Sequence, residues 1–428
     1  MSNVLDADLE TDHEANPVAQ GFWVQPRERI EEILTAYRTE RPVTFIPEPV
    51  PPPDVPLPQG PGTWLVTRHA DILHASKHPE IFSSASGITL LDAPPEFNEF
   101  FSSMIAMDDP RHARLRRIVS AGFTPRMLGQ LEGTVQQVAA EIVDGISERG
   151  EVDFIVDVAA ELPLRIVCEL MGVPASQYRF VFDRTNVILG ASDPEYVAEN
   201  ENILGAIFSA GSDLSQLMHE VAENKKGGDG TDLTSQLMNA DLGEDRLSET
   251  DLASFFILLV VAGNETTRNA IGWGLTFLTE NPDQRARWMA DFEGLAPTAV
   301  EEIVRLGSPV TYMRRTVAQD TELGGQKLAV GDKVCMMYLA ANRDEAVFED
   351  PFRFDVGRNP NPHVGFGGPG PHFCLGAHLA RREITVMFRE LFDRLPDIEA
   401  AGPPVPLMSS FIHGVKHLDA RFSPVAPR

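Results

Sequence analysis

The sequence predicts a mainly α-helical protein with small β-sheets, folded as one large domain, on three observations. Apolar residues recur with helical spacing over most of residues 127–238 and 247–282. Short alternating segments around glycine turns, which are β-hairpin signals, follow in residues 308–344. The 428 residues show neither an internal repeat nor a composition shift that would mark a domain boundary.

Composition excludes several classes of partner. Hydrophobic residues make up 43% of the chain, which suffices for a sizeable core, and the formal charge of −27 argues against nucleic acid or anionic membrane as the main partner. Three cysteines provide no disulfide framework, which favours a reducing cytoplasm. The most apolar stretch, residues 255–262, is far shorter than the ~20 residues of a membrane span. We expect a cytoplasmic monomer without a transmembrane segment.

The N-terminal part predicts a tail and then small elements. Residues 1–20 are acidic and are expected to form a flexible tail ahead of a folded domain at 21–428. Residue spacing and proline content then predict a helix, an extended loop, a strand and a second helix at residues 26–39, 46–62, 64–67 and 70–76.

Residues 247–282 predict a long central helix. It begins at Ser248 with a capping-box pattern and would extend roughly 45–50 Å, enough to cross the core. Its middle reads AGNETT, where Gly263 removes a side chain and Thr266 can bond to the carbonyl of Ala262. Taken alone, Thr266 is better interpreted as an ordinary buried threonine bonded to its own helix; Gly263 and the Cys374 loop described below reverse that preference.

Residues 365–376, GFGGPGPHFCLG, form a glycine-rich loop around Cys374, directly before another helical pattern. Glycine allows positive φ and a close approach of the backbone to a flat group. A thiolate ahead of a helix is stabilised by the helix dipole. Without other ligands at zinc spacing, Cys374 suits the axial position of a haem iron, whereas the alternative is a buried structural thiol.

This loop resembles the cysteine-ligand loop of the cytochrome P-450 family, the haem-thiolate monooxygenases. Gly370 lies four residues before Cys374 and His372 lies two before it, as in that family. Phe366 lies eight residues before the cysteine rather than seven, so the loop carries one extra residue. This longer loop is similar to that of bacterial lipid- and sterol-oxidising members.

The resemblance implies a cytochrome P-450 fold with haem b between the central helix and the Cys374 loop. Cys374 would be the axial iron ligand. In the family, the acid–alcohol pair matched by Glu265 and Thr266, beside Gly263, delivers protons during use of O2. The positions that would hold the haem and its propionates are matched by His112, Arg116, Arg315, His372, Phe366 and Gly376.

A Glu-x-x-Arg pair is formed by Glu302 and Arg305, one helical turn apart. Such pairs are commonly surface ion pairs of little energetic value. The resemblance instead implies a buried structural lock completed by a later arginine. Arg353 and Arg358 are both candidates, and Arg358 is preferred.

The resemblance also implies a substrate pocket and a docking surface. Residues 178–211 would cover the pocket, and the hairpin at 409–417 would enter it. The expected pocket residues are Leu259, Ala262, Val310, Phe411 and Ile412. Four arginines on an otherwise acidic chain would form the surface that receives a ferredoxin: Arg114, Arg117, Arg381 and Arg382.

The predicted function is hydroxylation of an unactivated C–H bond of a lipophilic substrate, with O2 and electrons from NAD(P)H through ferredoxin reductase and ferredoxin. The motifs most resemble those of ω-hydroxylases acting on methyl-branched fatty acids, isoprenoids and sterol side chains. The alternatives are a terpene or macrolide hydroxylase, a peroxide-dependent peroxygenase and a non-catalytic haem-binding protein. A peroxygenase would not need Glu265 and Thr266, and turnover with a surrogate ferredoxin would separate an enzyme from a haem-binding protein.

Overall fold

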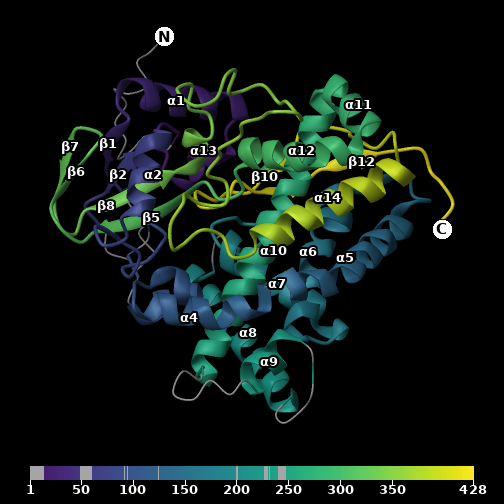
Figure 1. The fold of residues 1–428 in the computed structure, drawn as a ribbon, viewed down its shortest axis with the longest axis horizontal. Coiled ribbons are helices and arrows are strands. Elements are labelled where there is room, and N and C mark those ends of the chain that lie inside the picture. Colours follow the sequence, from purple (N-terminus) through teal and green to yellow (C-terminus); the bar gives the residue numbers. More distant parts are fainter. Residues whose placement is uncertain are drawn as a thin grey trace.

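The computed structural model describes residues 14–48, 60–90, 92–93, 95–123, 125–198, 201–225, 230, 232–239 and 247–428. Helices dominate, and β1, β2 and β5–β8 gather at one side (Figure 1). The helices are α1 (Arg27–Glu40), α2 (His69–Lys77), α3 (Pro95–Ser102), α4 (Arg111–Val119), α5 (Pro125–Ile146), α6 (Glu161–Met171), α7 (Tyr178–Gly190), α8 (Ile203–Lys225), α9 (Leu233–Asn239), α10 (Glu249–Glu280), α11 (Pro282–Ala290), α12 (Phe292–Gly307), α13 (Tyr338–Ala341) and α14 (Ala377–Arg394).

The strands form small sheets. They are β1 (Val43–Ile46), β2 (Thr63–Val66), β3 (Phe82–Ser83), β4 (Glu151–Asp153), β5 (Tyr312–Val317), β6 (Thr321–Leu323), β7 (Gln326–Leu328), β8 (Lys333–Met337), β9 (Glu399–Ala400), β10 (Val405–Pro406), β11 (Val415–His417) and β12 (Asp419–Arg421). The largest sheet has the order β1-β2-β8-β5-β3, in which only β2 and β8 run parallel. The prediction of a mainly α-helical protein with small sheets is confirmed.

The N-terminal elements follow the sequence prediction, with one correction. The predicted helices and strand correspond to α1, α2 and β2. Residues 15–19 are buried, and Asn16 donates to the Pro47 carbonyl, so the predicted tail boundary at residue 20 is too late. Residues 1–13, and residues 49–59 of the predicted extended loop, lie outside the described part of the chain.

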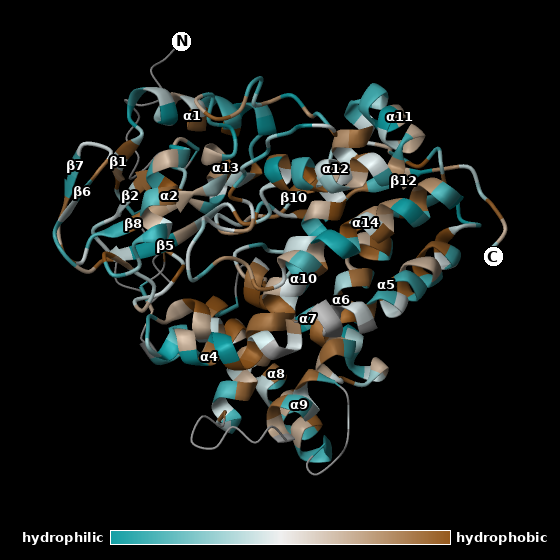
Figure 2. Ribbon diagram, in the orientation of Figure 1, coloured by the Kyte–Doolittle hydropathy of each residue, from teal (hydrophilic) through white to brown (hydrophobic). Residues whose placement is uncertain are grey.

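Helix α10 crosses the core. Its 32 residues give it a length of about 48 Å. Ser248 and Asp251 form the predicted capping box, in which the Ser248 hydroxyl accepts from the Asp251 amide at 3.0 Å. The helix packs on α3, α6, α8, α12 and α14, and it runs through the interior of the molecule, where apolar residues, drawn in brown, surround it (Figure 2). It therefore presents different faces to different neighbours.

One turn shows why glycine is required locally. Gly324 and Gly325, both at positive φ, connect β6 to β7 in the predicted hairpin. The terminal hairpin pairs β10 with β11.

Among the described residues, none of the helices combines the length and the apolar character needed to span a bilayer.

Candidate functional site

A mostly apolar cavity lies between α10 and the loop that precedes α14. Residues of α6, of β5 and of the segment before α4 complete its wall. Leu259, Ala262 and Val310 line it as expected. Other apolar lining residues, which the sequence did not connect to the pocket, are Ile88, Met104, Ile105, Val167, Leu258 and Met313.

Two predicted pocket residues lie elsewhere. Neither Phe411 nor Ile412 belongs to the cavity wall. Ile412 is buried and forms a bridge with Val310, and Phe411 packs against Tyr312 with 5.5 Å between ring centres. The hairpin tip thus supports the wall from behind. None of the described residues within 178–211 lines the cavity either, although α7 and α8 both pack on α10.

Gly263 and Thr266 face the cavity from α10. A Cβ added at Gly263 would meet only Val167, at 3.7 Å, which is ordinary van der Waals contact. Packing within the protein therefore does not require glycine here, and its absent side chain leaves a groove in the wall. The Thr266 hydroxyl donates to the Ala262 carbonyl at 2.7 Å, as the local pattern predicts.

Glu265 does not face the cavity. It leaves the helix about 100° away from Thr266 and is only 1% exposed. Its carboxylate forms a buried ion pair with Arg268, which donates to the Asn186 side chain of α7 at 3.0 Å. Burial raises the pKa of Glu265, while Arg268 lowers it. The second carboxylate oxygen of Glu265 and both polar atoms of the Asn264 side chain have no hydrogen-bond partner.

The loop that carries Cys374 is held by backbone hydrogen bonds. The Cys374 amide donates to the Phe366 carbonyl at 3.0 Å. Gly370 has a φ of 154°, and a Cβ there would lie 2.2 Å from the Ser76 carbonyl oxygen, so only glycine fits. Cys374, Phe366 and Gly376 all line the cavity.

The Cys374 side chain is accessible from the cavity that it lines, and the surrounding protein encloses that cavity. Burial within the surrounding protein raises the pKa of its thiol. The amides of Gly376 and Ala377 and the guanidinium of Arg116 lower it. The thiol is therefore presented to the cavity with nearby groups that favour its anionic form.

Four basic side chains cluster at the cavity: Arg116, Arg315 and His372 line it, and His112 lies against His372. The rings of His112 and His372 lie 4.1 Å apart, and one nitrogen of each ring is buried with no partner. Arg315 is buried and donates to the Arg314 carbonyl, and Arg116 donates to the Phe373 carbonyl. Burial and the nearby cations lower the pKa of His372 to about 2.

A cluster of donors facing a cavity fits a ligand that carries carboxylates. Within the part of the chain that the structure describes, His112 is the one of these four side chains that contacts a carboxylate, that of Asp109 at 3.3 Å. Buried cations normally have anionic partners. The orphaned nitrogens, the flat groove at Gly263 and the thiol of Cys374 on the same cavity together fit the propionates, the face and the axial iron position of a haem.

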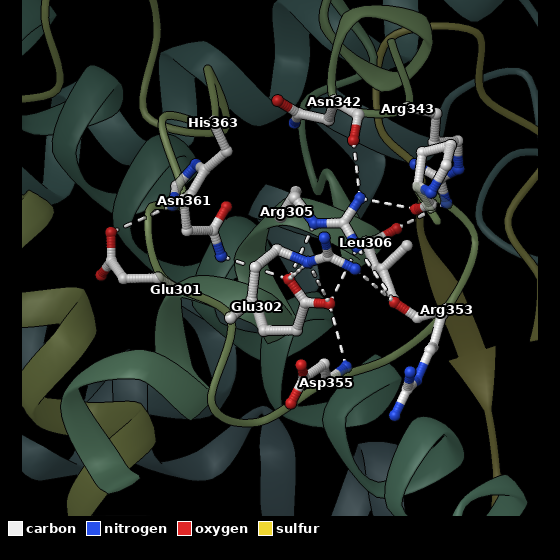
Figure 3. A network of polar contacts seen from close by, with 12 residues as sticks. Glu301, Glu302, Arg305, Leu306, Asn342, Arg343, Arg353, Asp355, Asn361 and His363 are labelled. Atoms are coloured by element: carbon white, nitrogen blue, oxygen red, sulfur yellow. Dashed lines mark hydrogen bonds and ion pairs between the residues drawn. The ribbon is translucent and has the colours of Figure 1, made fainter. Parts of the chain in front are cut away.

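Glu302 and Arg305 are fully buried in a polar network (Figure 3). Arg305 bonds both carboxylate oxygens of Glu302, at 2.7 and 2.8 Å, and donates to carbonyls of the 342–353 region. Arg358 contacts Glu302 at 3.1 Å through its guanidinium, whereas Arg353 contributes only its backbone carbonyl. Arg358 is thus the third charged member, and the network ties α12 to the segment before the Cys374 loop.

The four predicted docking arginines have different surroundings. Arg114 and Arg117 border a surface depression at α4, together with Arg111. Arg381 forms an ion pair with Glu301 and covers the Phe366 ring at 4.4 Å. Arg382 forms an ion pair with Glu132, an exposed residue of α5.

Comparison with known proteins decides the family. The model of the family described as Cytochrome P450 matches residues 210–396. A "Methyl-branched lipid omega-hydroxylase" of Mycobacterium tuberculosis is 47% identical over 408 residues, covering 94% of this chain and 93% of that protein. This chain belongs to the cytochrome P450 family.

Further relatives agree with this cytochrome P450 assignment. A "Steroid C26-monooxygenase" of Mycolicibacterium smegmatis is 38% identical, covering 83% of this chain and 82% of that protein. The structure of a Mycobacterium marinum cytochrome P450 in complex with pseudoionone has a TM-score of 0.87 at 41% identity, covering 94% of this chain and 97% of that one. This cytochrome P450 is therefore a haem- and O2-dependent monooxygenase, as predicted.

Sequence reasoning missed four polar residues around the site. Arg268 pairs with Glu265 and donates to Asn186, and Thr267 and Glu383 line the cavity. Arg268 carried a signal, because it is a charged residue in the middle of a helix predicted to cross the core. Glu383 could also have been found from the sequence, because it is a charged residue in a helical pattern directly before the buried residue Ile384.

Proposed function

We propose that this cytochrome P450 hydroxylates the terminal methyl group of a methyl-branched lipid, an isoprenoid or a sterol side chain. The observation that supports it most is the apolar lining that Leu258, Leu259, Val310 and Met313 give to the cavity that Cys374 also lines. An apolar wall binds a hydrocarbon chain through the hydrophobic effect and offers no partner to a polar substrate. The names of the two curated relatives support the same substrate class.

The chain's own residues would hold the haem as follows. Cys374 would be the axial ligand, and His112, Arg116, Arg315 and His372 would bind the propionates with charge-assisted or neutral donors. Haem b, when bound, supplies the activation of O2 that inserts one oxygen atom into a C–H bond.

Phe366 and Gly376 would contact the haem from the loop, since both line the cavity. The Glu302–Arg305–Arg358 network would act at a distance by fixing the segment that leads into this loop. Its role is structural.

Thr266 and Glu265 would have different parts in proton supply. The Thr266 hydroxyl faces the cavity and can hold a water beside the Gly263 groove. Glu265 points away, so its carboxyl must leave Arg268 before a proton can pass from it toward Thr266. The bond from Arg268 to Asn186 links this release to the position of α7.

Regiochemistry tests the proposed substrate. Turnover of a methyl-branched fatty acid should yield the terminal alcohol, and a straight-chain acid of equal length should bind more weakly. Pseudoionone serves as an isoprenoid probe, since a related structure contains it. Leu259→Phe should narrow the cavity and change the ratio of the hydroxylated products. Phe411→Leu, which alters a residue outside the cavity wall, should leave that ratio unchanged. Oxidation of macrolides with no reaction on branched chains would contradict the proposal.

A ferredoxin, reduced by NAD(P)H through its reductase, is the proposed electron donor. Arg114 and Arg117 would form the centre of its docking surface, because they line one surface depression at α4 together with Arg111. Charge reversal at Arg117 should raise the ferredoxin KM in a salt-dependent manner while leaving peroxide-driven turnover unchanged. The same reversal at the exposed Arg179 of α7 is the matched control. An equal effect of both charge reversals on the ferredoxin KM would exclude this docking surface.

The cellular location stays a proposal as well. The three cysteines are free thiols. Free thiols are typical of a reducing compartment, which supports the cytoplasm. Sedimentation of the purified holoenzyme would test the proposed monomer.

A further inference from the structure

Glu301 of α12 is a carboxylate that connects two segments flanking the Cys374 loop. Its Oε1 accepts from the Arg381 Nε of α14 at 2.5 Å. Its Oε2 accepts from the Arg381 Nη2 at 2.9 Å and contacts the His363 Nε2 at 3.0 Å. Figure 3 shows Glu301 and His363 beside the network of Glu302, in which Glu301 takes no part. Glu301 therefore joins α12 to α14 and to the segment that leads into the loop.

His363 carries the contact with Glu301 into the start of the loop. Its Nδ1 accepts from the Gly365 amide at 3.0 Å, so the ring is neutral and its Nε2 holds the proton that is donated to Glu301. The loop also approaches α12 closely here, because a Cβ on Gly365 would lie 2.6 Å from the Val304 side chain. Since Gly365 lines the cavity, these contacts fix the cavity wall relative to α12.

Arg381 brings a positive charge against the same loop. Its guanidinium carbon lies 4.4 Å from the centre of the Phe366 ring, well within the range of a cation–π contact. Phe366 lines the cavity, and its carbonyl accepts from the Cys374 amide at 3.0 Å. Arg381 lies on the second turn of α14, which begins three residues after Cys374. The ring that the guanidinium covers thus belongs to a residue bonded directly to the cysteine.

The cluster holds one full positive and one full negative charge. Burial raises the pKa of Glu301, but the bonds from Arg381 and His363 outweigh burial and hold this pKa at about 2. The side chains of Arg381 and Glu301 are 32% and 23% exposed, so solvent screens their charges only in part. Of the two charges, the cation is the one that contacts Phe366.

We propose that Arg381, held on Phe366 by Glu301, is a positioning residue that raises the reduction potential of the haem iron bound at Cys374. Reduction adds one electron to the iron–thiolate centre. A nearby cation stabilises the added charge, whereas a nearby carboxylate opposes it. Arg381 therefore raises the potential, and Glu301 limits the rise while it fixes the guanidinium. The two residues together set how strong a reductant the enzyme needs.

The inference rests on the proposed role of Cys374 as the axial ligand, and not on the proposed substrate or electron donor. It goes beyond the structural lock of Glu302, Arg305 and Arg358, because it assigns an electrostatic effect to a neighbouring ion pair.

A spectroelectrochemical titration of the holoenzyme tests the sign of both contributions. Arg381→Gln should lower the midpoint potential, because the cation is lost. Glu301→Gln should raise it, because the amide oxygen still accepts from Arg381 while the negative charge is gone. Each variant should change the ferric–ferrous equilibrium at least about threefold, or about 28 mV at about 59 mV per tenfold change for one electron. Arg381→Lys and the double variant should both return most of the way to the wild-type potential.

A matched control pair connects the same two helices. Arg389 of α14 donates to Glu293 of α12 at 2.7 Å, and its guanidinium lies 5.1 Å from the centre of the Phe292 ring. These three residues lie outside the cavity wall, so the pair repeats the arrangement of Arg381 and Glu301 away from the site. Arg389→Gln and Glu293→Gln should leave the potential unchanged. Shifts as large as those of the Arg381 and Glu301 variants would overturn the inference.

Opposite signs separate a charge effect from a loss of packing. If the cluster only held the loop in place, either substitution would loosen the same contact and both potentials would shift in one direction. That outcome would refute the role of Arg381. If Arg381→Gln does not retain haem, Glu301→Gln alone decides, since an unchanged or lowered potential contradicts the inference.

The ligand assignment is tested separately on the same wild-type samples. A red-shifted Soret band of the ferrous–carbonyl form reports thiolate ligation. With the band present, the absence of opposite shifts would refute the role of the ion pair. The absence of the band would instead refute Cys374 as the ligand, and the inference with it.

Discussion

Replacing Arg268 with methionine should lower the free energy of unfolding by about 3–5 kcal/mol, because a buried carboxylate would lose its cationic partner. Glu265 and Arg268 are each 1% exposed, so water cannot substitute for the missing guanidinium. Methionine retains much of the side-chain volume, which keeps a cavity from dominating the loss. The Asn186 side chain also loses its bond to Arg268, of 3.0 Å.

The destabilisation should depend on pH in a defined direction. Burial already raises the pKa of Glu265, and removing Arg268 raises it further. The folded variant then holds a proton that the unfolded chain releases above its ordinary pKa of about 4.3. Stability of Arg268→Met is thus highest below that pH and is lost as the pH rises toward the folded-state pKa of Glu265.

A double-mutant cycle measures this coupling. Denaturant midpoints of the haem-loaded wild type, Arg268→Met, Glu265→Gln and the double variant should show that the double variant recovers most of the loss. We expect an interaction energy of about 2–3 kcal/mol. Asn186→Ala is the control, with a pH-independent loss of about 1.5–3 kcal/mol for one hydrogen bond to a charged group. Arg268→Met could lower the free energy of unfolding by the same amount in the Glu265→Gln background as in the wild type. That result would show that the buried ion pair does not stabilise this site.

Three further outcomes concern the haem and proton supply. Cys374→His should abolish the red-shifted Soret band of the ferrous–carbonyl form, because imidazole donates less charge than thiolate; survival of the band would exclude Cys374 as the ligand. Arg315→Ala should lower haem retention on dialysis, since a buried propionate would lose a donor worth roughly 1–3 kcal/mol; equal loss in Arg114→Ala would contradict the assignment. Thr266→Ala should keep oxidising NAD(P)H while releasing hydrogen peroxide and forming little product; tight coupling would show Thr266 to be an ordinary helix threonine.

Local patterns determined most of the framework. The capping box at Ser248, the apolar spacing of residues 247–282 and the glycine loop around Cys374 act over a few residues, so their effects are readable without the fold. Gly370 is an instance: its left-handed φ and its contact with Ser76 require glycine, and the motif already places a glycine there. The family resemblance added roles to residues far apart in the chain.

Tertiary packing decided what these patterns could not. Helical spacing separates Glu265 from Thr266 by about 100°, but only tertiary packing decides that Thr266 faces the cavity while Glu265 is buried against Arg268. The hairpin containing Phe411 was expected in the pocket, yet it lies behind the wall. Whether a side chain faces a cavity depends on which neighbours cover the other faces of its element. That information lies in contacts between distant segments, which the order of residues along one chain does not specify.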